Sequence, residues 1–167
     1  LPGARISYFR INKESRKITE AGIAFNKIIN RAGKEVTDAS DLVFNGLSKL
    51  CSAFGTEPGQ YGFVDRIYLT GEETPGGSVF ALDVDEKVLW AAPALGVGKW
   101  ENAVPLDLPE LNKTHVIVLL GDDTPQAPLY LYVGEKNQSE DASFLDRNGL
   151  GEGKLYIWKS DDNSITP

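Results

Sequence analysis

The sequence predicts an all-β protein, built as a sandwich, a barrel or a propeller. Six segments after residue 62 are rich in β-branched and aromatic residues and are bounded by Gly, Pro, Asp or Asn, as strands usually are. Several are joined by short turns, and strong helical patterns are almost absent. The 167 residues are enough for one domain with its own core, or for a piece of a larger one.

The N-terminal third carries weaker signals. Residues 6–11 alternate apolar and polar side chains, which predicts a half-buried strand followed by a polar turn. Apolar residues in 18–33 have helical spacing, but the segment also fits a strand followed by irregular chain. Residues 34–62 are expected to be mainly loop or short helix, with Thr37 and Asp38 as candidate N-caps.

The six predicted strands occupy residues 63–71, 77–84, 86–93, 114–123, 128–136 and 153–161. The second and third should pair as an antiparallel hairpin of blade-like size, and so should the fourth and fifth. The run "VIVLL", from Val116 to Leu120, is apolar on both faces, which predicts a strand covered on both sides. Residues 94–113 and 137–152 are expected to be long irregular loops, which often carry function.

The composition of the chain argues against several classes of function. The net charge of −7 argues against a nucleic-acid or anionic-membrane surface, whereas excess carboxylate suits hard cations. Cys51 is the single cysteine, so an internal disulfide is impossible, and one histidine makes a Ser-His-Asp triad or a His-rich zinc site improbable. The longest apolar run is far too short to cross a bilayer. The chain has no methionine and begins Leu-Pro-Gly, so we expect a processed or proteolysed fragment.

Three acidic motifs are the candidate site. "GEETPGG" carries Glu72 and Glu73, "KWENAV" carries Glu101, and "GDDTPQ" carries Asp122 and Asp123. Successive residues at a strand end point in opposite directions, so one acid of each pair is expected to face a site while the other caps the turn. Converging carboxylates repel one another unless a cation lies between them. The alternative is that all are solvated turn residues of a plain β-sandwich.

Taken in order, "LCSAF", "IYLTGEE", "WENAVPL", "VIVLLGDD", "LYLYVGEK" and "GLGEGKLYIWK" resemble the PhoX-type alkaline phosphatases. These are secreted β-propeller phosphoesterases whose site holds iron and calcium. The motifs span about residues 47–159. The resemblance implies that residues 1–167 are a single partial domain, a fragment of about two to three blades of a β-propeller. Trp100 stands where the better-known members have His, and Gly71 where they have Cys.

The resemblance also implies a ligand set for calcium and iron: Cys51, Glu72, Glu73, Glu101, Asp122 and Asp123. Truncation of Glu72 or Asp122 to Ala would then abolish metal binding. No residue is assigned a catalytic role beyond metal ligation.

The leading function is metal-dependent hydrolysis of a phosphate ester, and the alternative is a non-catalytic calcium-binding propeller that serves as a scaffold or surface assembly component. A second chain, from the same precursor or a copy of this one, is expected to complete the ring, because an open arc leaves apolar edges exposed. The expected location is secreted or periplasmic, or at the cell surface.

Overall fold

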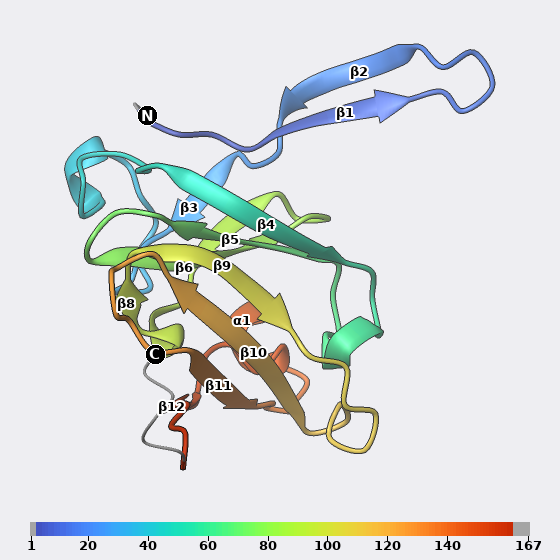
Figure 1. The fold of residues 1–167 in the computed structure, drawn as a ribbon. Helices are drawn as coiled ribbons and strands as arrows, with labels where there is room; N and C mark the ends of the chain where they lie inside the picture. Colours follow the sequence, from blue (N-terminus) through green and yellow to red (C-terminus); the bar gives the residue numbers. More distant parts are fainter. Residues whose placement is uncertain (1–2, 162–167) are drawn as a thin grey trace.

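The computed structural model describes residues 3–161 and confirms the all-β prediction (Figure 1). The strands are β1 (Ser7–Ile11), β2 (Ile18–Ile23), β3 (Lys27–Ile29), β4 (Leu50–Thr56), β5 (Ile67–Glu72), β6 (Gly77–Asp83), β7 (Val88–Ala91), β8 (Val97–Gly98), β9 (Trp100–Pro105), β10 (His115–Asp122), β11 (Tyr130–Glu135) and β12 (Gly153–Ile157). Short helical turns lie between some of them: η1 (Ala39–Asp41), η2 (Gln60–Gly62), η3 (Pro93–Leu95) and α1 (Phe144–Arg147).

Two antiparallel meanders form the body of the molecule. In the first, β4, β5, β6 and β7 pair in sequence order, and β3 adds to β7 in parallel. In the second, β9, β10, β11 and β12 pair in sequence order. The short β8 pairs with β6, and β1 and β2 form a separate two-stranded ribbon. None of the sheets described for residues 3–161 closes on itself.

Both predicted hairpins are present. Strands β6 and β7 pair with Leu82 opposite Leu89, and β10 and β11 pair with Ile117 opposite Val133. The predicted strand at 63–71 corresponds to β5, and that at 153–161 corresponds to β12. Residues 137–152 contain only α1 as regular structure and are otherwise irregular, as expected.

The first strand of each meander was not predicted from sequence. Residues 34–62 contain the expected short helical turns but also β4, and residues 94–113, expected to be irregular, contain β8 and β9. The segments "LCSAFGT" and "WENAVP" carry small, polar or Pro residues that weaken a strand signal. They become strands because β5 and β10 offer them a hydrogen-bonding edge.

Two expectations for the N-terminal region were also wrong. The helical interpretation of 18–33 does not hold: the chain there forms β2 and β3, as the strand alternative proposed. Strand β1 is not half-buried but mostly exposed, with Phe9 and Ile11 each 60% accessible.

The larger core lies between the two meanders. Ile67 and Leu69 of β5 meet Val118 and Leu120 of β10, and the indole of Trp100 is buried among them. A second cluster covers the opposite face of the first sheet, where Ile6, Ile28, Leu42 and Leu47 pack on Phe80, Leu82 and Leu89. Strands β5 and β6 of the first sheet are therefore covered on both faces, whereas β4 is largely exposed. In "VIVLL" the prediction of two covered faces holds for all but Leu119, which is half-buried.

The two meanders meet along their first strands. Strand β9 lies beside β4 and β5 (Figure 1). The approach is close at Gly71, where an added Cβ would lie 2.6 Å from the Cβ of Trp100. Because the sheets touch here, the acidic turns after β5 and β10 are brought to the same edge.

Candidate functional site

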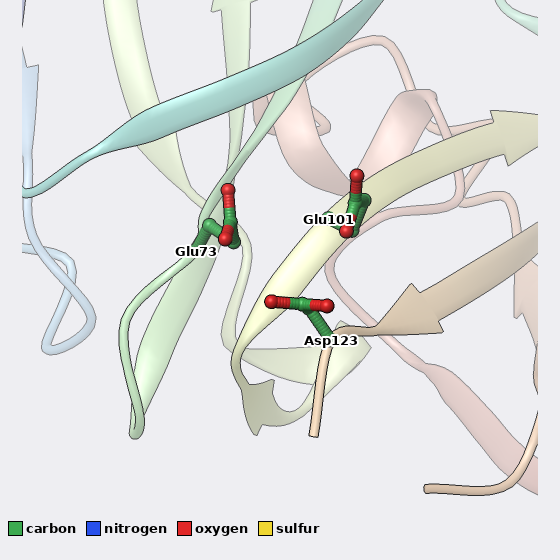
Figure 2. A group of neighbouring side chains, drawn as sticks. All are labelled: Glu73, Glu101 and Asp123. Atoms are coloured by element: carbon green, nitrogen blue, oxygen red, sulfur yellow. The ribbon is translucent and has the colours of Figure 1, made fainter. Parts of the chain in front are cut away.

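Three of the predicted ligands converge at this edge. One carboxylate oxygen from each of Glu73, Glu101 and Asp123 lies within 4.8 Å of the others. Figure 2 shows the three side chains pointing toward one another from separate segments. Glu73 follows β5, Glu101 lies in β9, and Asp123 follows β10. We call this group the acidic cluster.

Two lysines, which sequence reasoning missed, hold the cluster in place. The backbone N–H of Glu73 donates to the carbonyl of Lys49 (3.0 Å), and the Lys49 amine pairs with the Glu73 carboxylate (2.5 Å). In the same way, the N–H of Asp123 donates to the carbonyl of Lys99 (2.8 Å), and the Lys99 amine pairs with the Asp123 carboxylate. Lys99 also lies 3.7 Å from Glu73.

The first acid of each pair, Glu72 or Asp122, accepts backbone hydrogen bonds instead of joining the acidic cluster. Glu72 is 3% exposed, and its carboxylate accepts from the backbone N–H groups of Ser48 (2.8 Å) and Ser78 (3.0 Å). Asp122 accepts from the N–H groups of Lys99 (3.2 Å) and Thr124 (2.8 Å). Both carboxylates are occupied by backbone N–H groups. The structure thus places Glu72 and Asp122 outside the acidic cluster, which makes them poor candidates for the ligands whose truncation would abolish metal binding.

These arrangements repeat 50 residues apart. Lys49, Gly71 and Glu73 correspond to Lys99, Gly121 and Asp123, and both acid pairs are followed by Thr-Pro. The strand register follows the same 50-residue offset: Leu69 lies opposite Ala81, and Leu119 lies opposite Leu131. The signal that would have found the lysines is their constant distance from the acids: each precedes its partner by 24 residues.

Cys51 lies at the margin of the cluster. In the 50-residue repeat it is the counterpart of Glu101. The exposed thiol donates a hydrogen bond to Glu73, and this bond, with some burial, raises the pKa of Cys51. The thiol is therefore held in its protonated form.

The electrostatics keep the Glu73 carboxylate ionised. The Lys49 amine and then the Cys51 thiol lower the pKa of Glu73 to about 2. The carboxylate of Asp123 raises the pKa of Lys99. Two ammonium groups thus offset the mutual repulsion of three carboxylates, leaving an acidic excess that a cation can share.

The geometry fits one hard cation. Calcium binds carboxylate oxygens at about 2.3–2.6 Å, so ligands on opposite sides of it lie about 5 Å apart, close to the spacing of the cluster. The cluster offers oxygen only. A fit to iron depends on the Cys51 thiol, which here donates to Glu73 rather than standing free as a thiolate.

Trp100 is not part of this site. It is 1% exposed and lies in the core, edge-on to Tyr130 with ring centroids 5.6 Å apart. Its indole nitrogen is buried without a hydrogen-bond acceptor among the described residues. Trp100 and Glu101 point to opposite faces of β9, as successive strand residues do.

Comparison with known proteins gives no match: no protein-family model, no curated protein and no solved structure is similar to this chain. Within the part of the chain that the structure describes, no helix has the length and apolar character needed to cross a membrane.

Proposed function

We propose that this chain is part of a β-propeller that binds a divalent cation between two blades and hydrolyses phosphate esters there. The observation that carries the proposal is the convergence of Glu73, Glu101 and Asp123 from three segments of two sheets. Acidic residues that only cap solvated turns would have no reason to bring their carboxylates together.

The repeat supports the propeller part of the proposal. Two consecutive four-stranded meanders, related by 50 residues and meeting at their first strands, are what two successive blades of a propeller look like. On this reading β4 and β9 are the inner strands, and the acidic cluster lies near the ring axis.

The chain's own residues have defined tasks in this proposal. Glu73, Glu101 and Asp123 would hold the cation, for which calcium is our first choice, and the resemblance adds iron with Cys51 nearby. Lys49 and Lys99 would exchange a carboxylate for a phosphate oxygen when substrate enters. A bound cation supplies charge stabilisation on the phosphoryl group and a lowered pKa for water. A secreted or periplasmic location, or the cell surface, is part of the same proposal.

The test combines metal binding with hydrolysis. The purified chain is titrated with calcium and with iron, and release of phosphate from a generic phosphomonoester is followed. We expect cation-dependent release that is lost in Glu73→Gln and Asp123→Asn and kept in the control Glu110→Gln, an exposed acid outside the cluster. Calcium binding without hydrolysis would favour the non-catalytic scaffold instead. Absence of both binding and hydrolysis would contradict both functions.

A further inference from the structure

The second meander has an apolar face that the rest of the described chain covers only in part: Val104 and Tyr156 are exposed and Leu119 is half-buried, whereas Ile117 is 7% exposed. Along β10, Val116, Val118 and Leu120 point into the core, so Ile117 and Leu119 point to the other side. We call this side the outer face. Its residues are Val104, Ile117, Leu119, Leu131, Val133 and Tyr156.

The outer face is a continuous surface rather than scattered residues. The strand register aligns Val104, Leu119, Leu131 and Tyr156 in one row across all four strands. Val104 is 37% and Tyr156 is 49% exposed, and Leu119 and Leu131 are half-buried. A row of apolar side chains of this kind marks an interaction surface.

The 50-residue repeat shows what kind of element covers such a face. Ile117, Leu119 and Leu131 are the counterparts of Ile67, Leu69 and Ala81. The latter three are all 0% exposed, because the second sheet packs on them. The outer face therefore corresponds to a surface that is covered by a β-sheet.

The β1–β2 ribbon presents a matching apolar surface. Phe9, Ile11, Ile18 and Ile23 are 50–61% exposed, and the register pairs Ile11 with Ile18. We call these four residues the ribbon face. The ribbon extends away from the body, on the opposite side of the molecule from β12 (Figure 1). Among the described residues, the one ring contact between the ribbon and the body is that of the Tyr8 ring with Lys87. A two-stranded ribbon with so little packing is only marginally stable in water, so this one needs a partner.

The charges around the two surfaces are complementary. Residues 1–34 contain eight Lys or Arg and two Asp or Glu, whereas residues 35–167 contain nine and twenty-two. A groove of about 320 Å³ at one end of the outer face is lined by Val133, Tyr156, Glu135 and Glu152, together with His115, Gly153 and Lys154. The ribbon carries four cations, Arg10, Lys13, Arg16 and Lys17, against two acids, Glu14 and Glu20, of which Glu20 pairs with Arg10. A basic rim facing an acidic rim favours and orients association.

We propose that the ribbon face of one copy of this chain packs on the outer face of a second copy. The contact is head-to-tail, since it joins two different surfaces, and each copy has both. Such a contact produces a ring if the rotation closes and a filament if it does not. The proposal does not depend on the acidic cluster.

Three double variants and their molar masses in solution test it. The ribbon variant is Phe9→Gln with Ile18→Gln, and the face variant is Val104→Gln with Tyr156→Gln. The control is Val43→Gln with Val64→Gln, two valines that are 59% and 51% exposed outside both surfaces. Light scattering coupled to size exclusion measures each protein alone, and then an equimolar mixture of the ribbon and face variants.

We expect the wild type and the control to form assemblies larger than 18.2 kDa that grow with concentration. The ribbon variant and the face variant should each be monomeric. Their mixture should give a dimer of twice that mass, because one intact surface remains on each partner, and this recovery also shows that both variants are folded. A monomeric wild type, a monomeric control, or a mixture that stays monomeric would overturn the proposal.

Discussion

Glu72 and Glu73 are adjacent in sequence, yet their carboxylates lie in different environments. Glu72 is buried and accepts two backbone hydrogen bonds, whereas Glu73 pairs with Lys49 and joins the acidic cluster. Asp122 and Asp123 are divided in the same way. Each pair thus supplies its own control, since a change at one member tests the turn and the same change at the other tests the cluster.

Glu72→Ala should lower the free energy of unfolding. The substitution leaves the N–H groups of Ser48 and Ser78 without their acceptor, at a cost of roughly 2–4 kcal/mol in total. Urea denaturation followed by tryptophan fluorescence measures the change. A loss of cation binding with unchanged stability would show that Glu72, and not its neighbour, is the ligand.

Gly71→Ala should be destabilising, and Gly55→Ala should not. A Cβ at Gly71 would lie 2.6 Å from the Trp100 Cβ and 2.7 Å from its carbonyl oxygen, so β5 and β9 would have to separate. Overpacking of this kind costs about 1–3 kcal/mol.

Gly55 lies in the adjacent strand β4, and an added methyl group there would meet nothing within 4 Å. Its replacement by Ala should leave stability unchanged or raise it slightly. Thermal unfolding of the two variants makes the comparison, and equal melting temperatures would contradict the close approach of β5 and β9.

Asn148→Ala should destabilise the contact between the 137–152 segment and the loop that precedes β5. The Asn148 side chain is fully buried, accepts from the N–H groups of Val64 and Asp65, and donates to Asp65 and to the carbonyl of Phe144. Leaving these groups unpaired should cost roughly 2–4 kcal/mol. Asn137→Ala, at an exposed position, is the control and should change the unfolding midpoint little. Similar effects of both substitutions would argue against this network.

Glu73→Ala should make Cys51 more acidic. In the wild type the hydrogen bond to Glu73 raises the pKa of the thiol, so thiolate forms only at higher pH than in an ordinary cysteine. Removing Glu73 should move the midpoint of alkylation rate against pH downward. Glu101→Gln should move it less, because Glu101 makes the smallest contribution. An unchanged profile in Glu73→Ala would mean that the two side chains do not interact.

Strand pairs with long apolar, β-branched runs could be predicted from the sequence. The composition of "VIVLL" and "LYLYV" is enough to predict β10 and β11. Strands β4 and β9 could not, because their residues are small or polar and depend on the edge of a neighbouring strand that lies up to 22 residues away.

The site was predictable in outline. Alternation at a strand end indicates that one acid of each pair caps the turn and the other faces a site, and the structure has this division. Alternation does not show which acid of a pair caps the turn and which faces the site, because the register of β10 with β9 shifts between Gly121 and Asp122. Such a bulge exchanges the faces of the residues that follow it. Lys49 and Lys99 were missed because a lone lysine carries no signal until the 50-residue repeat is noticed.

Calcium titration of two neighbouring variants, followed by calorimetry, tests the central claim most directly. Asp123→Asn removes a carboxylate from the acidic cluster, whereas Asp122→Asn alters a turn cap one residue away. The account predicts that Asp123→Asn weakens calcium binding by at least about tenfold, the smallest loss usual even for residues that only support a ligand, while Asp122→Asn binds as the wild type does. Equal affinities in the two variants, or a wild type that binds no calcium, would contradict it.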